Sequence, residues 1–266
     1  MTPSSSSAPP ATYLRYVALG DSQTEGVGDG DDTTGLRGCA DRLAERLAEL
    51  DPEVRYANLA VRGRLAGQVR AEQLQPALAL RPDLATVVAG VNDLMRPSFD
   101  ADETAGHLEA MFAALTEAGA KVATVTFPDV GRMIPVARPL GGRITALNAR
   151  IRIAAERHDV ALAETAHPPV FTDPRLWAAD RLHASPLGHA RIAAAVADAL
   201  HLPGSDDSWT RPLPPQPAAA RAATAELRWL ASYLGPWLGR RLRGRSSGDG
   251  RAARRPQLLP VSPAQA

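Results

Sequence analysis

The sequence predicts an α/β protein, a three-layer α/β/α sandwich around a five-stranded parallel sheet, with a C-terminal amphipathic helical extension. Two observations predict the sandwich. From Tyr13 onward, short apolar runs alternate with longer segments in which apolar residues recur at helical spacing, and this alternation is typical of parallel strands joined by helices. The short runs are apolar throughout, as expected for strands that helices cover on both faces.

The predicted elements follow one another in regular order. The strands are residues 17–19, 54–61, 84–89, 121–127 and 160–164. The helices are residues 39–50, 102–118, 142–158 and 187–200, in which Leu, Ile, Val, Met or Phe at spacings of three and four form one apolar face. Ligands of such folds bind beyond the carboxyl ends of the strands, so residues that directly follow a strand are the first candidates for a site.

The segments outside this alternation differ in composition. Residues 1–12 are rich in Ser, Pro and Ala, the tail 244–266 is basic, and both are expected to be disordered. Residues 203–217 read as a Pro-rich linker. Residues 218–243 are expected to form an amphipathic helix with Leu, Trp and Tyr on one face. The folded domain is therefore predicted to span residues 13–202.

Composition excludes several classes of protein. The formal net charge is +1, so the chain carries no broad basic surface for nucleic acid. No apolar run approaches the roughly 18 to 20 residues of a membrane span, and the N-terminus lacks the basic and apolar regions of a secretory signal. The single cysteine, Cys39, excludes an internal disulfide. We expect a cytoplasmic protein that is not an integral membrane protein.

The first strand leads directly into Gly20-Asp21-Ser22-Gln23. The glycines of this loop allow a sharp turn, which we expect to present the Ser22 hydroxyl to the cleft. Serine is a poor nucleophile unless a base removes its proton, so Ser22 is a candidate nucleophile that needs a base nearby. The plainer alternative is that Ser22 only caps the helix that follows.

Asp180 and His183 supply that base. An unperturbed imidazole has a pKa near 6.5, which suits proton transfer at neutral pH. Asp180 lies three residues before His183, so its carboxylate is expected to hold the imidazole in place. The remaining histidines are expected to be structural or exposed: His107, His158, His167, His189 and His201.

Three groups are candidates for stabilising the negative charge that develops on the carbonyl oxygen during attack. They are the backbone N–H of Ser22, the backbone N–H of Gly63 and the side-chain amide of Asn92, each just after a predicted strand. Gly67 is a rival for Gly63. A turn glycine and an Asx-turn are the plainer explanations for Gly63 and Asn92. The neighbouring acids Asp21 and Asp93 are expected to support the site through hydrogen bonds.

On Ser22, Gly63, Asn92 and His183, the chain resembles the SGNH hydrolases, also called the GDSL esterase/lipase family, over roughly residues 13–202. The resemblance implies a flavodoxin-like sandwich, a Ser-His-Asp triad completed by Asp180, and ester hydrolysis through an acyl-enzyme without a metal or an organic cofactor. Gln23 departs from the family motif, which has Leu there.

The substrate is expected to be a small-molecule ester. A simple ester, a lysophospholipid, a thioester and an acetylated sugar stay open, and so does the oligomeric state. The loops 97–100 and 129–140 are expected to form the walls around the acyl group.

Other readings compete with this one. Residues 26–30, Gly-Val-Gly-Asp-Gly, are similar to a dinucleotide-binding loop but lack the G-x-G-x-x-G spacing. Residues 244–248 fit the G-x-S-x-G pattern of a nucleophile elbow, yet no strand is predicted before them. A third alternative is a catalytically inactive hydrolase fold that serves as a binding module. For the helix 218–243, packing on the domain or covering the cleft competes with peripheral contact with an anionic membrane and with binding a partner.

Overall fold

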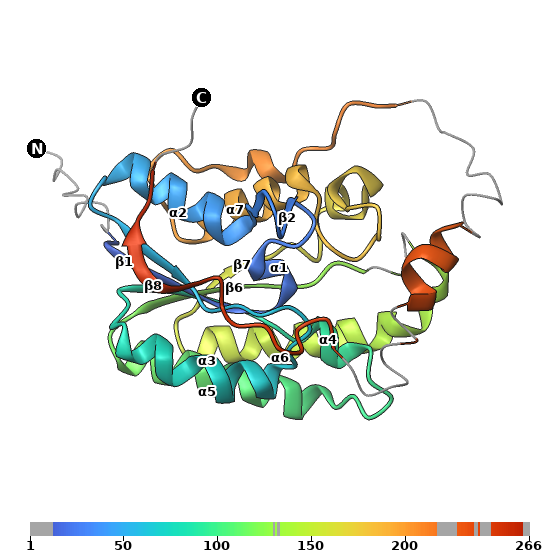
Figure 1. Ribbon diagram of the computed structural model, residues 1–266, viewed down its shortest axis with the longest axis horizontal. Helices are drawn as coiled ribbons and strands as arrows, with labels where there is room; N and C mark the ends of the chain where they lie inside the picture. Colours follow the sequence, from blue (N-terminus) through green and yellow to red (C-terminus); the bar gives the residue numbers. More distant parts are fainter. Residues whose placement is uncertain are drawn as a thin grey trace, which may run out of the picture.

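The computed structural model describes residues 13–129, 131, 134–216, 228–236, 239 and 246–262. A six-stranded sheet in the order β7-β6-β5-β1-β4-β8 forms the centre of the molecule (Figure 1). All strands are parallel except β8, which runs antiparallel to β4. The strands are β1 (Arg15–Gly20), β4 (Arg55–Asn58), β5 (Leu84–Val88), β6 (Lys121–Val125), β7 (Ala161–Ala163) and β8 (Arg255–Pro260).

Helices cover both faces of this sheet. On one face lie α2 (Cys39–Leu50) and α7 (Pro186–Ala199), and on the other lie α3 (Ala66–Ala79), α5 (Ala101–Glu117) and α6 (Gly141–Arg157) (Figure 1). All five residues of β5 are buried, as expected for a strand between two helical layers. The three-layer α/β/α sandwich is confirmed, and without β8 the strand order is the 2-1-3-4-5 order of flavodoxin-like folds.

Shorter elements complete the domain. They are α1 (Ser22–Glu25), α4 (Val91–Leu94), the hairpin strands β2 (Gly30–Asp31) and β3 (Gly35–Leu36), and the 3-10 helices η2 (Pro135–Leu140), η3 (Pro169–Thr172), η4 (Pro174–Leu176) and η5 (Asp207–Thr210).

The apolar patterns locate most of these elements well. Each predicted apolar run overlaps a strand, and the four predicted helices differ from α2, α5, α6 and α7 by at most one residue at either end. The sequence analysis missed α3. Its buried face includes the amide of Gln73, and Pro76 lies inside the helix, so neither the apolar spacing nor the propensity indicates a helix there.

The tail departs most from expectation, because the sheet has a sixth strand. The predicted disorder of residues 244–266 is wrong for 255–260, which form β8 on the free edge of β4. Three tail arginines bind the domain: Arg251 pairs with Asp32 at 2.7 Å, Arg254 pairs with Asp41, and the Arg255 guanidinium donates to the Tyr56 carbonyl at 2.9 Å. The basic composition that suggested disorder therefore attaches the tail to the domain.

The predicted linker also begins as part of the folded domain. Trp209 in η5 is buried, and its indole N–H donates to the Asp198 carboxylate of α7 at 2.9 Å. Its ring lies 6.1 Å from that of Phe171. The predicted boundary at residue 202 is thus too early.

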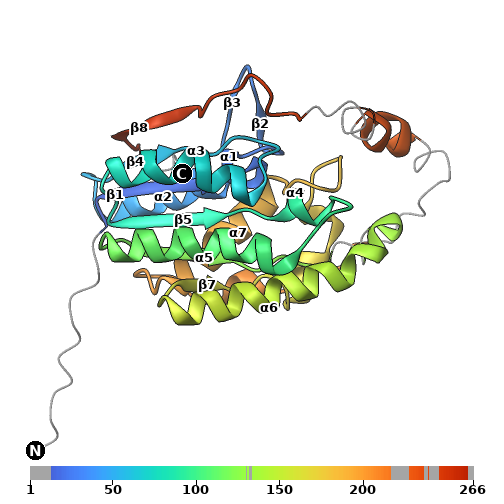
Figure 2. The same cartoon turned by 90° about the horizontal axis from the view of Figure 1, so that it is seen from below.

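Residues 228–236 of the predicted amphipathic helix are helical and include the π-helical turn η6 (Leu230–Leu234). Figures 1 and 2 both place this segment at the end of the sheet where β5 leads into α4. Most of the remainder of the predicted helix 218–243 lies outside the described residues, as does the predicted disordered segment 1–12. Within the described ranges, no helix is long and apolar enough to cross a membrane.

Candidate active site

Ser22 lies at the first position of α1, directly after β1. Asp21 caps this helix, since its carboxylate accepts from the Gln23 N–H at 3.3 Å. Ser22 therefore does not fill the capping role that was its plainer explanation. Ser22 is buried, with 9% of the residue exposed.

A buried glutamine fixes the strand end before this serine. The Gln73 amide accepts from the Gly20 N–H at 2.8 Å and donates to the Gly20 carbonyl at 2.9 Å. These bonds satisfy both backbone groups of Gly20, the last residue of β1, and so hold the start of the serine loop. The sequence analysis missed Gln73. A polar residue four positions after Val69, on the buried face of α3, was the available signal.

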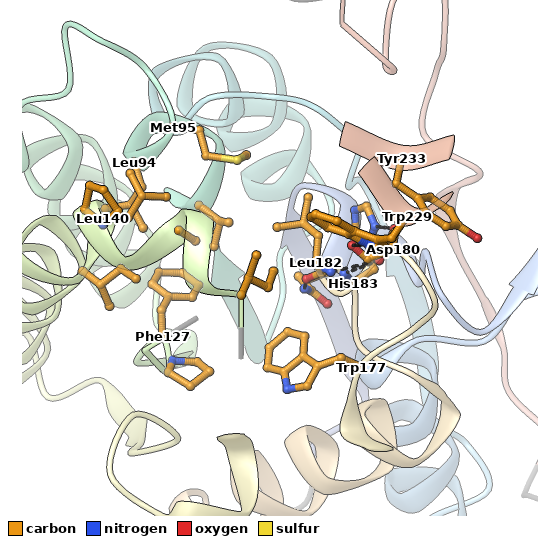
Figure 3. A pocket seen from close by; sticks show the side chains of 17 residues that line it. Leu94, Met95, Phe127, Leu140, Trp177, Asp180, Leu182, His183, Trp229 and Tyr233 are labelled. Atoms are coloured by element: carbon orange, nitrogen blue, oxygen red, sulfur yellow. Dashed lines mark hydrogen bonds and ion pairs between the residues drawn. The ribbon is translucent and has the colours of Figure 1, made fainter. Parts of the chain in front are cut away.

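His183 is held by Asp180, as predicted. The imidazole Nδ1 lies 2.6 Å from Asp180 Oδ2, and Asp180 Oδ1 accepts the N–H groups of Leu182 and His183 at 2.9 and 3.0 Å. Arg181 has a φ of 62° in the tight turn between them. Figure 3 shows the carboxylate directed at the ring. The ring is therefore oriented through Nδ1, and Nε2 is the nitrogen that can take a proton from a nucleophile.

The environment of Asp180 favours its charged form. Burial alone would raise the pKa of this carboxyl, but hydrogen bonding to His183, the charge of that ring and the two backbone N–H donors together lower the pKa below its usual value. An ionised Asp180 accepts a proton-bearing Nδ1, so the neutral imidazole keeps its lone pair on Nε2.

Gln23 joins the serine loop to the histidine loop. Its amide nitrogen donates to the Leu182 carbonyl at 3.0 Å, and its amide oxygen accepts the Ala184 N–H at 3.2 Å. These two partners flank His183, and Gln23 directly follows Ser22. Among the described residues no hydrogen bond joins the Ser22 hydroxyl to the His183 ring, and such bonds commonly tighten only when substrate binds. The departure from Leu at this position thus has a structural role.

Replacing Gln23 by leucine is expected to lower kcat for a short-chain p-nitrophenyl ester by about 10- to 100-fold, because the His183 loop loses both of its bonds to the serine loop. KM and the melting temperature should change little, which distinguishes a positioning residue from a structural one. Gln68→Leu is the matched control, because Gln68 bonds only the exposed backbone N–H of Leu65. Unchanged kcat in folded Gln23→Leu would contradict the positioning role.

Two of the groups expected to hold an oxyanion are backbone N–H groups. In the part of the chain that the structure describes, neither the Ser22 N–H nor the Gly63 N–H donates to a protein acceptor. The loop before Gly63 is anchored to α1, because Glu25 accepts from the Arg62 N–H at 2.7 Å and from its guanidinium at 2.8 Å. The rival Gly67 lies within α3 against the His107 ring, which favours Gly63.

Asn92 lies beside the serine loop, but its amide is engaged. It donates to Asp21 Oδ2 at 3.1 Å and to the Arg64 carbonyl at 3.0 Å. Burial raises the pKa of Asp21 to about 7, against the lowering effects of the Gln23 N–H and the charge of His183. An oxyanion would therefore have to displace one of the two acceptors that the Asn92 amide now holds.

Asp93 supports the same loop. Its carboxylate accepts the Ala66 N–H at 3.0 Å and so ties α4 to the first residue of α3. Burial raises the pKa of Asp93. Asp21 and Asp93 thus both make hydrogen bonds that hold the loops of the site.

Two sequence stretches that are similar to other motifs, residues 26–30 and 244–248, contact the loops of the site. Gly28 of the 26–30 stretch packs against the histidine loop, where a Cβ would lie 2.1 Å from the Ala184 carbonyl oxygen. In the 244–248 stretch, the Ser246 hydroxyl donates to the Gly63 carbonyl at 3.2 Å. Gly63 has a φ of 78°, and a Cβ on it would lie 2.1 Å from Ser246 Oγ. The described tail residues 246–248 therefore cover the Gly63 loop.

An apolar cavity of about 400 Å³ adjoins His183 (Figure 3). The predicted wall 129–140 contributes to it, and the predicted wall 97–100 does not. The residues lining the cavity are Gln23, Val91, Leu94, Met95, Phe127, Pro128, Ile134, Ala137, Pro139, Leu140, Ile144, Trp177, Asp180, Leu182, His183, Trp229 and Tyr233.

His189 and Cys39 have structural positions. His189 is fully buried, accepts the Cys39 N–H through Nδ1 at 3.1 Å and donates from Nε2 to the Val27 carbonyl at 3.1 Å. Burial lowers the pKa of His189 to about 4 and raises that of the Cys39 thiol to about 12. Both side chains are therefore uncharged at neutral pH. Across the described ranges, no group of three His, Cys, Asp or Glu side chains could hold a metal ion.

Comparisons with known proteins agree with this architecture. The model of the GDSL-like lipase/acylhydrolase family matches residues 18–191. An α/β hydrolase enzyme from the metagenome of Lake Arreo, Spain, is 22% identical with a TM-score of 0.59, covering 71% of this chain and 95% of its own. An acetylxylan esterase from Geobacillus stearothermophilus is 20% identical with a TM-score of 0.60, covering 74% and 96%. At these identities the likeness is one of fold. No curated protein sequence matches the chain.

Proposed function

Since the chain belongs to the GDSL-like lipase/acylhydrolase family and shares its fold with a solved α/β hydrolase and a solved acetylxylan esterase, we propose that it is a serine esterase that cleaves carboxylic esters through an acyl-enzyme on Ser22. One observation carries the proposal. Asp180 Oδ2 lies 2.6 Å from His183 Nδ1 and orients the ring. Gln23, the residue after Ser22, makes two hydrogen bonds to the same histidine loop. A base oriented in this way beside a serine serves nucleophilic catalysis.

In the first half of the reaction, Ser22 Oγ forms a bond to the ester carbonyl carbon while His183 Nε2 takes the hydroxyl proton. The carbonyl π electrons move to the oxygen, which the N–H groups of Ser22 and Gly63 stabilise. Asn92 joins them if its amide turns from Asp21. His183 then gives its proton to the alkoxy oxygen as the carbonyl–oxygen bond breaks, which releases the alcohol and leaves the acyl group on Ser22.

In the second half, water replaces the alcohol. His183 takes a proton from water as the water oxygen attacks the acyl carbon, and the same N–H groups hold the second oxyanion. Collapse breaks the bond to Ser22 Oγ, which regains its proton from His183. The carboxylic acid leaves, and Asp180 stabilises the imidazolium in both halves.

A fluorophosphonate probe tests this proposal directly. We expect stoichiometric labelling of the peptide that contains Ser22 and loss of labelling in Ser22→Ala. Ser246→Ala is the matched control, because Ser246 sits in the G-x-S-x-G decoy and should leave labelling intact. A folded protein that the probe does not label would overturn the proposal and favour the catalytically inactive binding module.

A further inference from the structure

We propose that the cavity beside His183 binds the acyl chain of the substrate and that the C-terminal segment 228–236 closes it, so that the enzyme prefers fatty acyl esters of about octanoyl length to acetyl esters. The inference rests on the proposed esterase function and names its substrate class. An acetyl group would leave most of this cavity of about 400 Å³ empty, and the volume lies in the ordinary range for ligand pockets.

The lining has two ends of different chemistry. In Figure 3 the polar groups gather at His183 and Asp180, while the labelled side chains of Leu94, Phe127 and Leu140 lie away from them. An ester of a fatty acid has the same polarity, with a carbonyl at one end and methylenes at the other. The carbonyl would lie at His183 and the chain would extend toward Leu140.

Three polar side chains of the lining, those of Gln23, Trp177 and Trp229, are engaged by the protein. The Gln23 amide bonds the histidine loop. The Trp177 indole N–H donates to the Phe171 carbonyl at 3.0 Å, and that of Trp229 donates to the Asp180 carbonyl at 3.2 Å. Both indoles are therefore anchored by their N–H groups. A sugar would need several hydrogen-bonding groups here, because its hydroxyls lose water on entry, so this cavity suits a hydrocarbon chain better than a carbohydrate.

The outer wall comes from beyond the matched family region. Trp229 and Tyr233 are four residues apart in the helical segment 228–236, and both line the cavity. The segment is attached at the catalytic loop, because the Arg181 guanidinium also lies 4.6 Å from the centre of the Trp229 ring. Residues 18–191 match the family, so this wall lies outside the matched region.

The expected selectivity follows from methylene burial. Each methylene taken from water into an apolar site favours binding by about fourfold, and octanoate has six more than acetate. We therefore expect kcat/KM for p-nitrophenyl octanoate to exceed that for p-nitrophenyl acetate by at least about 100-fold in the full-length protein.

Two variants test which residues set this ratio. Tyr233→Ala removes part of the outer wall, and Ala137→Trp fills the cavity from η2; each should lower the octanoate-to-acetate ratio by about tenfold or more. The matched controls are Ser232→Ala and Arg138→Trp, which change exposed neighbours that do not line the cavity. Neither control should change the ratio.

The outcomes separate the two proposals. If kcat/KM of the wild-type protein for p-nitrophenyl acetate equalled or exceeded that for p-nitrophenyl octanoate, the acyl-chain inference would be overturned and the esterase proposal would stand. Equal ratios in the variants and their controls would overturn the assignment of the cavity. A protein that hydrolyses neither ester and resists the fluorophosphonate probe would overturn both.

Discussion

Replacing Ser22 by alanine is expected to lower kcat for p-nitrophenyl esters by about 10³- to 10⁶-fold, because the variant has no hydroxyl to form the acyl-enzyme. The substitution should leave the fold intact. Asp21, and not Ser22, caps α1, and the bonds of Gly20 to Gln73 hold the loop from the side of β1.

Steady-state kinetics and a thermal melt check this result together. The Ser22→Ala protein should melt within a few degrees of the wild type. Ser246→Ala should keep wild-type kcat, because the Ser246 hydroxyl bonds the carbonyl of Gly63 and the N–H of Gly248, and the N–H of Gly63 keeps its place. Turnover within tenfold of the wild type by a pure, folded Ser22→Ala sample would refute the nucleophile.

Replacing Asp180 by asparagine is expected to lower kcat by about 10⁴-fold. Asp180 now accepts at both oxygens, from His183 Nδ1 on one side and from two backbone N–H groups on the other. An asparagine amide has one accepting and one donating end. If its oxygen keeps the backbone donors, its NH2 faces Nδ1 and selects the tautomer whose Nε2 carries the proton. That tautomer cannot accept a proton from Ser22.

Asp206→Asn is the matched control. Asp206 likewise accepts a backbone N–H in a turn, from Ser208 at 2.9 Å, but it meets no imidazole. We expect kcat to be unchanged in this control, with only a small change in melting temperature. If Asp180→Asn and Asp206→Asn gave the same kcat, Asp180 would have no part in orienting the base.

The sequence predicts those elements of the fold that depend on residues close together in the chain. Apolar spacing locates α2 and α5 because each helix buries one continuous stripe. The same reasoning fails for α3, where Gln73 on the buried face serves the backbone of β1. Its partner lies 53 residues away, and nothing in the local pattern shows that a buried amide will find it.

The contacts of the candidate site likewise fall into local ones, which the sequence predicts, and long-range ones, which it does not. The interaction of His183 with Asp180 spans three residues, so spacing alone could predict it. The bridge from Gln23 to the histidine loop spans about 160 residues, and it depends on how two loops meet in the folded domain. The engagement of the Asn92 amide by Asp21 is also long-range. Residue types thus indicate the chemistry, while the contacts that position them require the tertiary structure.

Strand β8 pairs with β4 at the edge of the sheet, although the two strands are far apart in the sequence. Arg255 reaches the Tyr56 carbonyl across 199 residues, whereas the other neighbour of β4 is β1, which is much nearer in the sequence. During synthesis, the hydrogen-bonding edge of β4 therefore stays open until nearly the whole domain has emerged, and open edges invite pairing with other chains. We therefore expect β8 to pair with β4 late in folding. Until then, the nascent chain is most exposed to pairing with other chains through the edge of β4.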